Sequence, residues 1–126
     1  MYKIGVDITT VSRIKDSMEK GDFKNFVYSE KELESFYFID KPKYSSLRAN
    51  FAAKEAFSKA LGTGIRNFSL DEVEILRDGL GKPYFSFYGK AAEIMVGFSA
   101  QVSLSHEGDT AIAMVLLERD KTIINL

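Results

Sequence analysis

The spacing of apolar and polar residues along the chain predicts a mixed fold of helices and strands. In the first half, apolar residues recur at every third or fourth position, which is typical of helices with one buried face. In the second half they alternate with polar residues, which is typical of strands packed on one side. We therefore expect helices over residues 9–19, 29–39, 44–61 and 88–98, and strands over residues 2–6, 72–76, 82–87, 100–105 and 110–117. Strands that gather late in the chain indicate the α+β class, an antiparallel sheet packed with helices.

Turn and capping residues mark where several of these elements begin and end. Ser29-Glu30-Lys31-Glu32 has the capping-box pattern, so the second helix should begin there. Gly62 should end the third helix as its C-cap. Asp78–Gly81 should turn one strand back onto the next as a hairpin, and His106–Asp109 should turn the chain into its last strand.

Composition limits the class of protein. A chain of 126 residues is expected to form a single domain, residues 1–126, with its own core. Its 17 Lys and Arg nearly balance 18 Asp and Glu, which gives no support to general nucleic-acid binding. The absence of cysteine excludes disulfides, zinc–thiolate sites and a cysteine nucleophile. No apolar leader opens the sequence, and its longest apolar run, Ala111–Leu117, is far shorter than the roughly 20 residues that a membrane helix needs. We therefore expect a soluble cytoplasmic protein that binds neither nucleic acid nor membranes.

The helix over residues 44–61 carries the side chains that most suggest chemistry. At about 100° per residue, four residues share a narrow stripe opposite its apolar side: Arg48, Ala52, Glu55 and Lys59. One interpretation is a solvated face with a Glu55–Lys59 pair worth roughly 0.2–0.5 kcal/mol. The other is a site where alanines allow a ligand to come close and Gly62-Thr63-Gly64 offers N–H groups and a hydroxyl. The wheel alone leaves both open and favours the solvated face.

Two residues outside this helix are also candidates. Asp7 follows the first predicted strand, where its carboxylate would stand at a sheet edge or cap the next helix. His106, the single histidine, ends a strand at a turn. Taken separately, each is better explained as a structural residue than as a ligand or a catalyst.

Four motifs change these odds because they occur together and in one order. They are Gly5-Val6-Asp7-Ile8 with Arg13-Ile14, then FAAKEAFSKALGTG at residues 51–64, then Gly81-Lys82-Pro83-Tyr84, then Val102-Ser103-Leu104-Ser105-His106. The set closely resembles the holo-acyl-carrier-protein synthases, the short 4'-phosphopantetheinyl transferases, from residue 3 to about residue 118. The resemblance implies the 4'-phosphopantetheinyl transferase-like fold and a homotrimer with its active sites between subunits.

The resemblance also implies roles for individual residues. Asp7 and Glu55 would be the protein ligands of Mg²⁺, an ion that prefers oxygen, and Mn²⁺ would suit the same atoms. Lys59 would lie against the diphosphate of coenzyme A, and Arg13 would meet the acidic acyl carrier protein. Further contacts to the coenzyme would come from Gly62, Thr63, Gly64, Lys82, Pro83, Ser105 and His106.

The implied reaction is transfer of the 4'-phosphopantetheine group from coenzyme A to a serine of apo-acyl carrier protein. It releases adenosine 3',5'-bisphosphate and supports fatty acid and lipid biosynthesis. Lys59 would neutralise charge on the leaving side of the phosphoryl group. Glu55 through a water, or His106, would take the serine proton, and the sequence does not choose between these two catalytic residues.

One position departs from the family's pattern. An arginine commonly stands directly before the Phe-Ala-Ala-Lys-Glu run, whereas this chain has Asn50. Arg48 lies two residues earlier, about 160° away on the wheel and on the Glu55–Lys59 stripe. We offer Arg48 as the hypothetical substitute cation for the coenzyme phosphates.

Three other functions are weighed against this one. Another Mg²⁺-dependent phosphotransfer or phosphohydrolase reaction would use the same carboxylates and lysine without a carrier protein. A catalytically silent domain would bind coenzyme A or the carrier without modifying it, and it has no physical need for Asp7, Glu55 and Lys59 together. A purely structural interaction module would require all four motifs to be coincidental.

Overall fold

The computed structural model describes residues 1–18, 23–38, 41–64 and 67–120. Its helices and strands are, in chain order, β1 (Tyr2–Thr10), α1 (Val11–Met18), α2 (Phe23–Val27), α3 (Glu30–Phe36), β2 (Tyr37–Phe38), β3 (Lys41–Pro42), α4 (Tyr44–Leu61), the 3₁₀ helix η1 (Leu70–Glu72), β4 (Val73–Arg77), β5 (Pro83–Phe87), α5 (Gly89–Ile94), β6 (Phe98–Glu107) and β7 (Thr110–Arg119).

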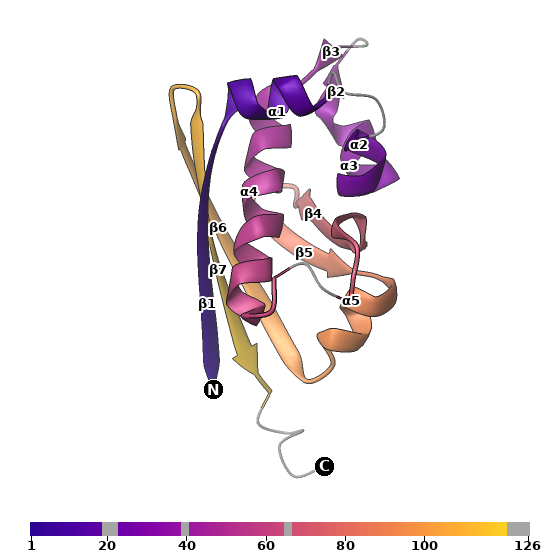
Figure 1. The fold of residues 1–126 in the computed structure, drawn as a ribbon, viewed down its shortest axis with the longest axis vertical. Coiled ribbons are helices and arrows are strands. Elements are labelled where there is room, and N and C mark those ends of the chain that lie inside the picture. Colours follow the sequence, from indigo (N-terminus) through magenta and orange to yellow (C-terminus); the bar gives the residue numbers. More distant parts are fainter. Residues whose placement is uncertain (19–22, 39–40, 65–66, 121–126) are drawn as a thin grey trace.

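A three-stranded antiparallel sheet in the order β1–β7–β6 forms one side of the molecule, with α4 against its inner face (Figure 1). Side chains of β7 alternate along the strand, as the sequence pattern requires. Those that face α4 are small or apolar and buried: Ala111, Ala113, Val115 and Leu117. The helix and the sheet therefore share one continuous core.

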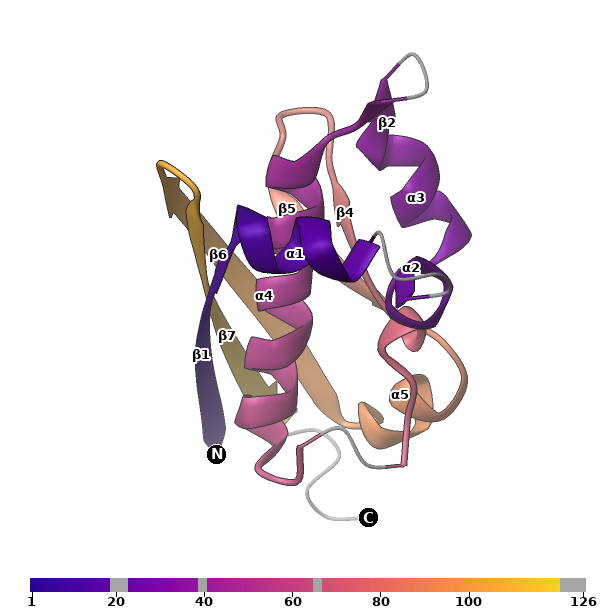
Figure 2. The ribbon, with the colours of Figure 1, turned by 45° about the horizontal axis from the view of Figure 1, so that its top comes forward.

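The β4–β5 hairpin and α5 pack against the other side of α4, and α1, α2 and α3 surround its first half (Figure 2). Phe57 of α4 joins the two sides, with its ring centre 5.2 Å from that of Phe87 and 5.7 Å from that of Phe68. A second cluster around Phe51 and Leu47 lies nearer the start of α4. Each buried ring or leucine contributes about 1.5–3 kcal/mol, so α4 is the central element of the fold.

Several sequence predictions are confirmed. Helix α4 has the predicted bounds, and Gly62 follows it with φ of 81° and an N–H that donates to the Lys59 carbonyl at 3.1 Å. The capping box is present, because Ser29 N–H donates to Glu32 Oε1 at 3.0 Å and Glu32 N–H donates to Ser29 Oγ at 3.1 Å. The β4–β5 hairpin and the α+β class are also as predicted.

The first strand is longer than the sequence suggested, and this changes the place of Asp7. Strand β1 continues to Thr10, and Asp7 lies within it, opposite Ala113 of β7. The alternation runs on past Asp7, because Val6 and Ile8 are exposed while Thr9 is buried. The expectation that Asp7 follows the strand, with a helix beginning at Thr9, is therefore wrong: α1 begins at Val11.

Other boundaries also differ. His106 and Glu107 belong to β6, so only Gly108 and Asp109 form the turn before β7. Helix α5 ends at Ile94, well before the predicted residue 98, and Gly97 follows with φ of 85°. The second predicted helix ends at Phe36, and its expected last residue, 39, lies outside the described residues. The short elements α2, β2, β3 and η1 were not predicted, because they are too brief to show a period.

Among the helices in the described ranges, none combines the length and the apolar character needed to cross a membrane.

Candidate functional site

Strand β1 and helix α4 approach each other closely because the residues between them are small. A side chain at Gly5 would place its first carbon 2.6 Å from the Ala60 nitrogen and would also collide with the Ala56 carbonyl. Glycine at this position therefore sets the spacing between strand and helix. Asp7 is two residues further along the same face of β1, so it also faces α4.

Asp7 and Lys59 form an ion pair at the open edge of this contact. Lys59 Nζ lies 2.9 Å from Asp7 Oδ1, and the side chains are 57% and 12% exposed respectively. The second carboxylate oxygen, Asp7 Oδ2, is buried and has no hydrogen-bond partner among the described residues. A buried acceptor without a partner is costly, so this atom favours an added cation or donor.

Glu55 is the second carboxylate at this place. It is partly buried, and burial raises its pKa above the ordinary value of 4.5, with the charge of Asp7 adding to the effect. The positive charges of Arg13 and Lys59 offset part of this rise in pKa. A partly buried carboxylate whose pKa is raised by burial and by a neighbouring carboxylate, with cations beside it, is typical of a site that receives a charged ligand.

These two carboxylates fit Mg²⁺. Within the described residues, no group of three or more acidic or histidine side chains gathers into a metal cage. Mg²⁺ commonly takes one or two carboxylates and fills the rest of its shell with water and substrate phosphate. A cation here would satisfy Asp7 Oδ2 and favour the charged form of Glu55.

Arg13 reaches the same place from α1. Its guanidinium carbon lies 5.5 Å from the centre of the Phe51 ring, and its backbone N–H donates to Thr10 Oγ1 at 3.4 Å. Because its charge affects the pKa of Glu55, the predicted carrier-protein residue and a predicted metal ligand are neighbours.

The predicted stripe on α4 is not a solvated face throughout. Arg48 is 2% exposed and Ala52 is fully buried. Arg48 Nη1 donates to the carbonyl of Gly108, in the β6–β7 turn, at 3.2 Å. Arg48 Nε is buried without a partner in the described part of the chain. The solvated-face interpretation is therefore wrong for this half of the stripe, where Arg48 ties the helix to the hairpin turn.

Gly62, Thr63 and Gly64 form the exposed end of α4. Gly62 and Gly64 have φ of 81° and 71°, and a side chain at either would extend into open space. The turn is thus accessible to a ligand, although the Gly62 N–H is already bonded to the helix.

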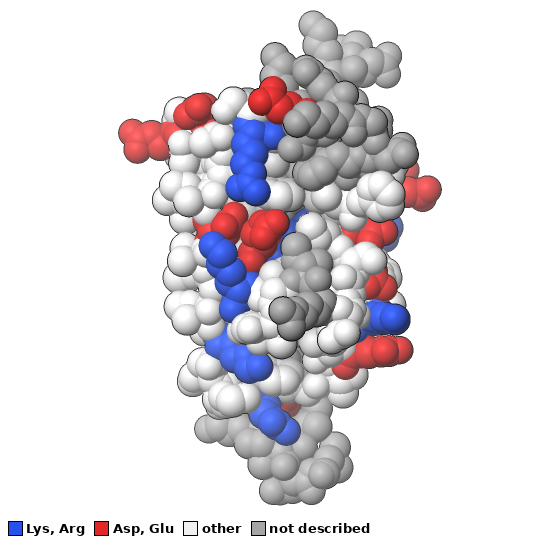
Figure 3. Space-filling model, in the orientation of Figure 1, with Lys and Arg blue, Asp and Glu red and all other residues white. Residues whose placement is uncertain are grey.

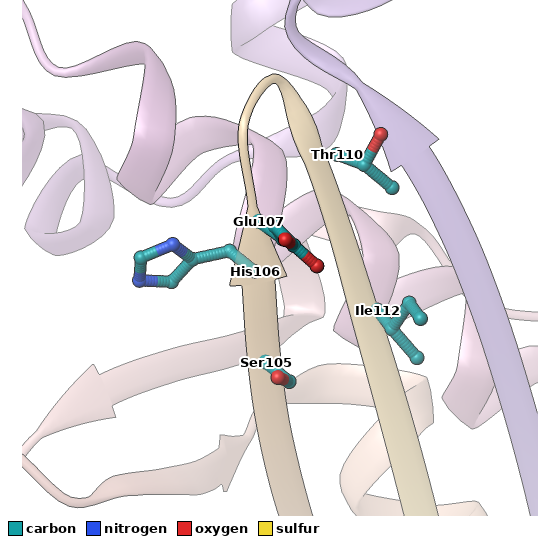
Figure 4. A pocket seen from close by; sticks show the side chains of 5 residues that line it. All are labelled: Ser105, His106, Glu107, Thr110 and Ile112. Atoms are coloured by element: carbon teal, nitrogen blue, oxygen red, sulfur yellow. The ribbon is translucent and has the colours of Figure 1, made fainter.

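Ser105 and His106 lie near the other hairpin turn. With Glu107, Thr110 and Ile112 they line a pocket of about 430 Å³. Figure 4 shows His106 pointing to the opposite side of β6 from Glu107, as successive strand residues do.

Lys82 and Pro83 lie at the start of β5, where Lys82 N–H donates to Asp78 Oδ1 at 2.9 Å. This turn and the β6–β7 turn both lie toward the end of the molecule where α4 begins, whereas Gly62–Gly64 lies at its opposite end (Figures 1 and 2). One chain therefore brings Asp7, Glu55 and Lys59 together but keeps the hairpin residues apart from Gly62–Gly64.

Sequence reasoning missed a second charged cluster on α4. Lys54 and Glu32 are both fully buried, with Lys54 Nζ 2.6 Å from Glu32 Oε1. Asn50 is also fully buried, and its Nδ2 donates to Glu32 Oε2 at 2.8 Å. The available signal was a lysine on the apolar side of the wheel and an acidic capping-box residue able to meet it.

On the face seen in Figure 3, Lys and Arg side chains follow a track over β1 and α4, and acidic side chains interrupt it. A basic surface beside a pair of carboxylates suits a ligand that brings both a metal and phosphate groups.

The sequence pattern of the 4'-phosphopantetheinyl transferase superfamily matches residues 3–115 of the chain. The chain belongs to this superfamily. The resemblance carried by the four motifs is thereby confirmed over the part of the sequence where they lie.

Curated members of the superfamily are similar along nearly their whole length. A holo-[acyl-carrier-protein] synthase of Fusobacterium nucleatum is 41% identical over 120 residues, which cover 90% of this chain and 96% of the relative. One of Clostridium perfringens is 43% identical over 124 residues, covering 91% and 92%.

Solved structures of the superfamily share the fold. The holo-[acyl-carrier-protein] synthase of Neisseria meningitidis gives a TM-score of 0.83 at 36% identity, covering 93% of this chain and 98% of that one. The Helicobacter pylori enzyme, solved in complex with coenzyme A, gives a TM-score of 0.78 at 30% identity, covering 91% and 99%. The predicted 4'-phosphopantetheinyl transferase-like fold is confirmed.

Proposed function

We propose that this chain is a holo-acyl-carrier-protein synthase. It transfers the 4'-phosphopantetheine group of coenzyme A to a serine of apo-acyl carrier protein and releases adenosine 3',5'-bisphosphate, a step that supplies fatty acid synthesis in the cytoplasm. The superfamily and the named relatives support this activity. The observation that assigns the activity to particular residues is the pair of partly buried carboxylates, Asp7 and Glu55, beside Lys59.

Asp7 and Glu55 are proposed to hold Mg²⁺, with Mn²⁺ as a second suitable ion. The orphaned Asp7 Oδ2 and the raised pKa of Glu55 support this assignment. When bound, the ion supplies Lewis-acid polarisation of phosphoryl oxygens.

Lys59 is proposed to neutralise charge on the diphosphate. Its ammonium is largely exposed and is already positioned by Asp7 at 2.9 Å. A fixed cation beside the leaving oxygen stabilises a phosphoryl-transfer transition state, because charge spreads over the phosphoryl oxygens as the bond breaks.

Glu55 or His106 is proposed to take the serine proton. Burial and the charge of Asp7 raise the pKa of Glu55 above its ordinary value of 4.5, which suits a general base that works near neutral pH. His106 is exposed at the rim of the hairpin pocket, on a strand that holds its backbone in place. Arg13, next to Glu55 and on the exposed face of α1, is proposed to meet the acidic carrier.

A homotrimer with shared active sites is part of this proposal. The outer face of the sheet carries a row of exposed apolar side chains: Tyr2, Ile4, Val6, Ile8, Ile112 and Met114. Such a continuous apolar face favours burial against another subunit. The separation of Ser105, His106, Lys82 and Pro83 from Gly62–Gly64 supports the same arrangement, in which a neighbour completes the coenzyme site.

The function is tested by the intact mass of apo-acyl carrier protein after incubation with this chain, coenzyme A and Mg²⁺. The proposal predicts a mass gain of one phosphopantetheine per carrier. A silent binding domain would bind the carrier or coenzyme with no mass gain. A phosphohydrolase would consume coenzyme A equally well without the carrier. Either result would contradict the proposed transfer.

A further inference from the structure

The Asp7–Lys59 ion pair joins two groups to which the proposed function gives different ligands. Asp7 is assigned to Mg²⁺ and Lys59 to the diphosphate of coenzyme A, yet Lys59 Nζ lies 2.9 Å from Asp7 Oδ1. The ammonium therefore already neutralises a carboxylate that a metal ion would use. One positive charge cannot serve both partners in full, so the ion pair competes with the ligands.

Lys59 lies on the solvent side of Asp7. Its side chain is 57% exposed, whereas that of Asp7 is 12% exposed. The second oxygen, Asp7 Oδ2, is buried and has no hydrogen-bond partner among the described residues. A Mg²⁺ ion loses its waters reluctantly and keeps several of them when it binds. Such a hydrated ion has to reach Asp7 from the exposed side, where the ammonium lies.

The Lys59 ammonium is held loosely enough to leave. In the described ranges its Nζ has one hydrogen-bond acceptor, Asp7 Oδ1, whereas Nζ of the buried Lys54 has three. The flexible four-carbon stem of a lysine lets Nζ move without any movement of the helix. Exposed ion pairs are weak, so breaking one changes an affinity by about fivefold at most.

The balance of charge also favours an exchange of cations at this site. The charges of Asp7, Arg13 and Lys59 all act on Glu55. A divalent ion held by Asp7 and Glu55 would cancel their two negative charges and leave the neighbouring cations in excess. Lys59 is the cation bonded to Asp7, so it is the one released. A diphosphate then supplies the negative charge that the released ammonium needs.

We propose that Lys59 is an exchangeable cation, which occupies Asp7 while the metal is absent and moves to the diphosphate when the metal binds. The identity of these two ligands rests on the proposed function. The consequence is cooperative binding. The metal frees Lys59 for the phosphate, and the phosphate draws Lys59 away from Asp7. Each ligand therefore raises the affinity of the other by the same factor.

The test is calorimetric titration of Mg²⁺ into the full chain, first alone and then with coenzyme A present. Lys59→Met should bind Mg²⁺ alone about fivefold more tightly than the wild-type chain, because no ammonium competes for Asp7. In the wild-type chain coenzyme A should raise the Mg²⁺ affinity, and this factor should be about fivefold smaller in Lys59→Met. Lys59→Gln is a second variant and should give the same two results.

Lys3→Met is the matched control, because it removes one positive charge from the same face of β1. Lys3 lies four residues before Asp7, about 13 Å along the strand, and its ammonium lies 5.7 Å from the centre of the Phe98 ring. At about 0.1 M salt, charges this far apart are largely screened, so the Mg²⁺ affinity should stay within about twofold of the wild-type value. Equal tightening in Lys3→Met and Lys59→Met would show an effect of net charge alone and overturn the exchange.

A Mg²⁺ affinity that is unchanged or weaker in Lys59→Met would also overturn the exchange, since Lys59 would then not compete with the metal for Asp7. The titrations contain no carrier protein, which separates this proposal from the proposed function. If Lys59→Met binds Mg²⁺ more tightly but the wild-type chain adds no mass to the carrier, the exchange stands and the proposed function fails. If the carrier gains mass but both chains bind Mg²⁺ equally, the function stands and the exchange fails.

Discussion

Helix α4 carries two lysines five residues apart, and each pairs with a carboxylate from another element. Lys54 lies 2.6 Å from Glu32 of α3, and both side chains are fully buried. Lys59 lies 2.9 Å from Asp7 of β1, with side chains that are 57% and 12% exposed. The two pairs have the same chemistry but differ in how completely their atoms are satisfied.

In the buried Lys54–Glu32 pair, which we call the closed pair, every strong donor and acceptor has a partner. Lys54 Nζ donates to Glu32 Oε1, to the Leu70 carbonyl at 2.8 Å and to the Val73 carbonyl at 2.7 Å. These three acceptors match the three N–H groups of an ammonium ion. Burial lowers the pKa of Lys54, and the charge of Glu32 and its hydrogen bond to the ammonium oppose this change. Nothing in this pair is left for a ligand.

In the Lys59–Asp7 pair, which we call the open pair, one strong acceptor has no hydrogen-bond partner among the described residues, namely Asp7 Oδ2. The adjacent Glu55 has a raised pKa. The protein therefore maintains an incompletely satisfied charge cluster beside a complete one on the same helix. The closed pair fixes α4 against α3 and β4. The open pair leaves a carboxylate oxygen that can bind a ligand.

The largest effect on stability is expected from breaking the closed pair. Lys54→Met should lower the free energy of unfolding by about 3–5 kcal/mol, because it leaves the Glu32 charge buried and unpaired. Urea unfolding measures this directly. Lys59→Met is the matched control at the open pair and should cost no more than about 1 kcal/mol. Equal losses in the two variants would remove the distinction between the pairs.

The largest effect on catalysis is expected from the open pair. Asp7→Asn should reduce kcat/KM for carrier modification by about a thousandfold, since metal-assisted charge stabilisation is worth several kcal/mol. Its free energy of unfolding should stay within about 1 kcal/mol of the wild-type value. A variant that keeps near-normal turnover, or that unfolds, would mean that Asp7 is structural.

Some parts of this contrast could be predicted from the sequence and others could not. The bounds of α4 were predictable, because its period is long and Gly62 ends it. The inward direction of Asp7 was not, since it depends on β1 pairing with β7 far along the chain. The burial of Arg48 was equally hidden, and that of Lys54 was indicated only by its place on the apolar side of the wheel. A helical wheel gives the direction of a side chain but not whether another element covers it.

The pH dependence of stability sharpens the comparison further. Burial and Asp7 raise the pKa of Glu55. The stability that comes from protonated Glu55 is therefore present below its ordinary value of 4.5 and lost as pH rises through the raised folded-state pKa. Without metal, the Tm should fall across this window, and Mg²⁺ should restore it.

Thermal melts with Mg²⁺ or with a chelator, over a series of pH values, check this expectation. The gain in Tm from Mg²⁺ should grow with pH in the wild-type protein and vanish in Glu55→Gln. A gain that is independent of pH, or one that persists in Glu55→Gln, would argue against Glu55 as a metal ligand.

The smallest effect on stability is expected at His106. This side chain is exposed, so His106→Ala should change the free energy of unfolding by less than about 0.5 kcal/mol. The pH–rate profile is the informative measurement. If the acidic limb survives in this variant, the proton goes to Glu55, and if the limb disappears, it goes to His106.

The most direct test of the account is the rate at which apo-acyl carrier protein gains mass with the wild-type chain and with Glu55→Gln. Both reactions contain coenzyme A and Mg²⁺, and both proteins are first shown to be folded. The account predicts a gain of one phosphopantetheine per carrier with the wild-type chain and no gain in the same time with Glu55→Gln. A near-normal gain with Glu55→Gln would contradict the claim that the open side of α4 carries the transfer.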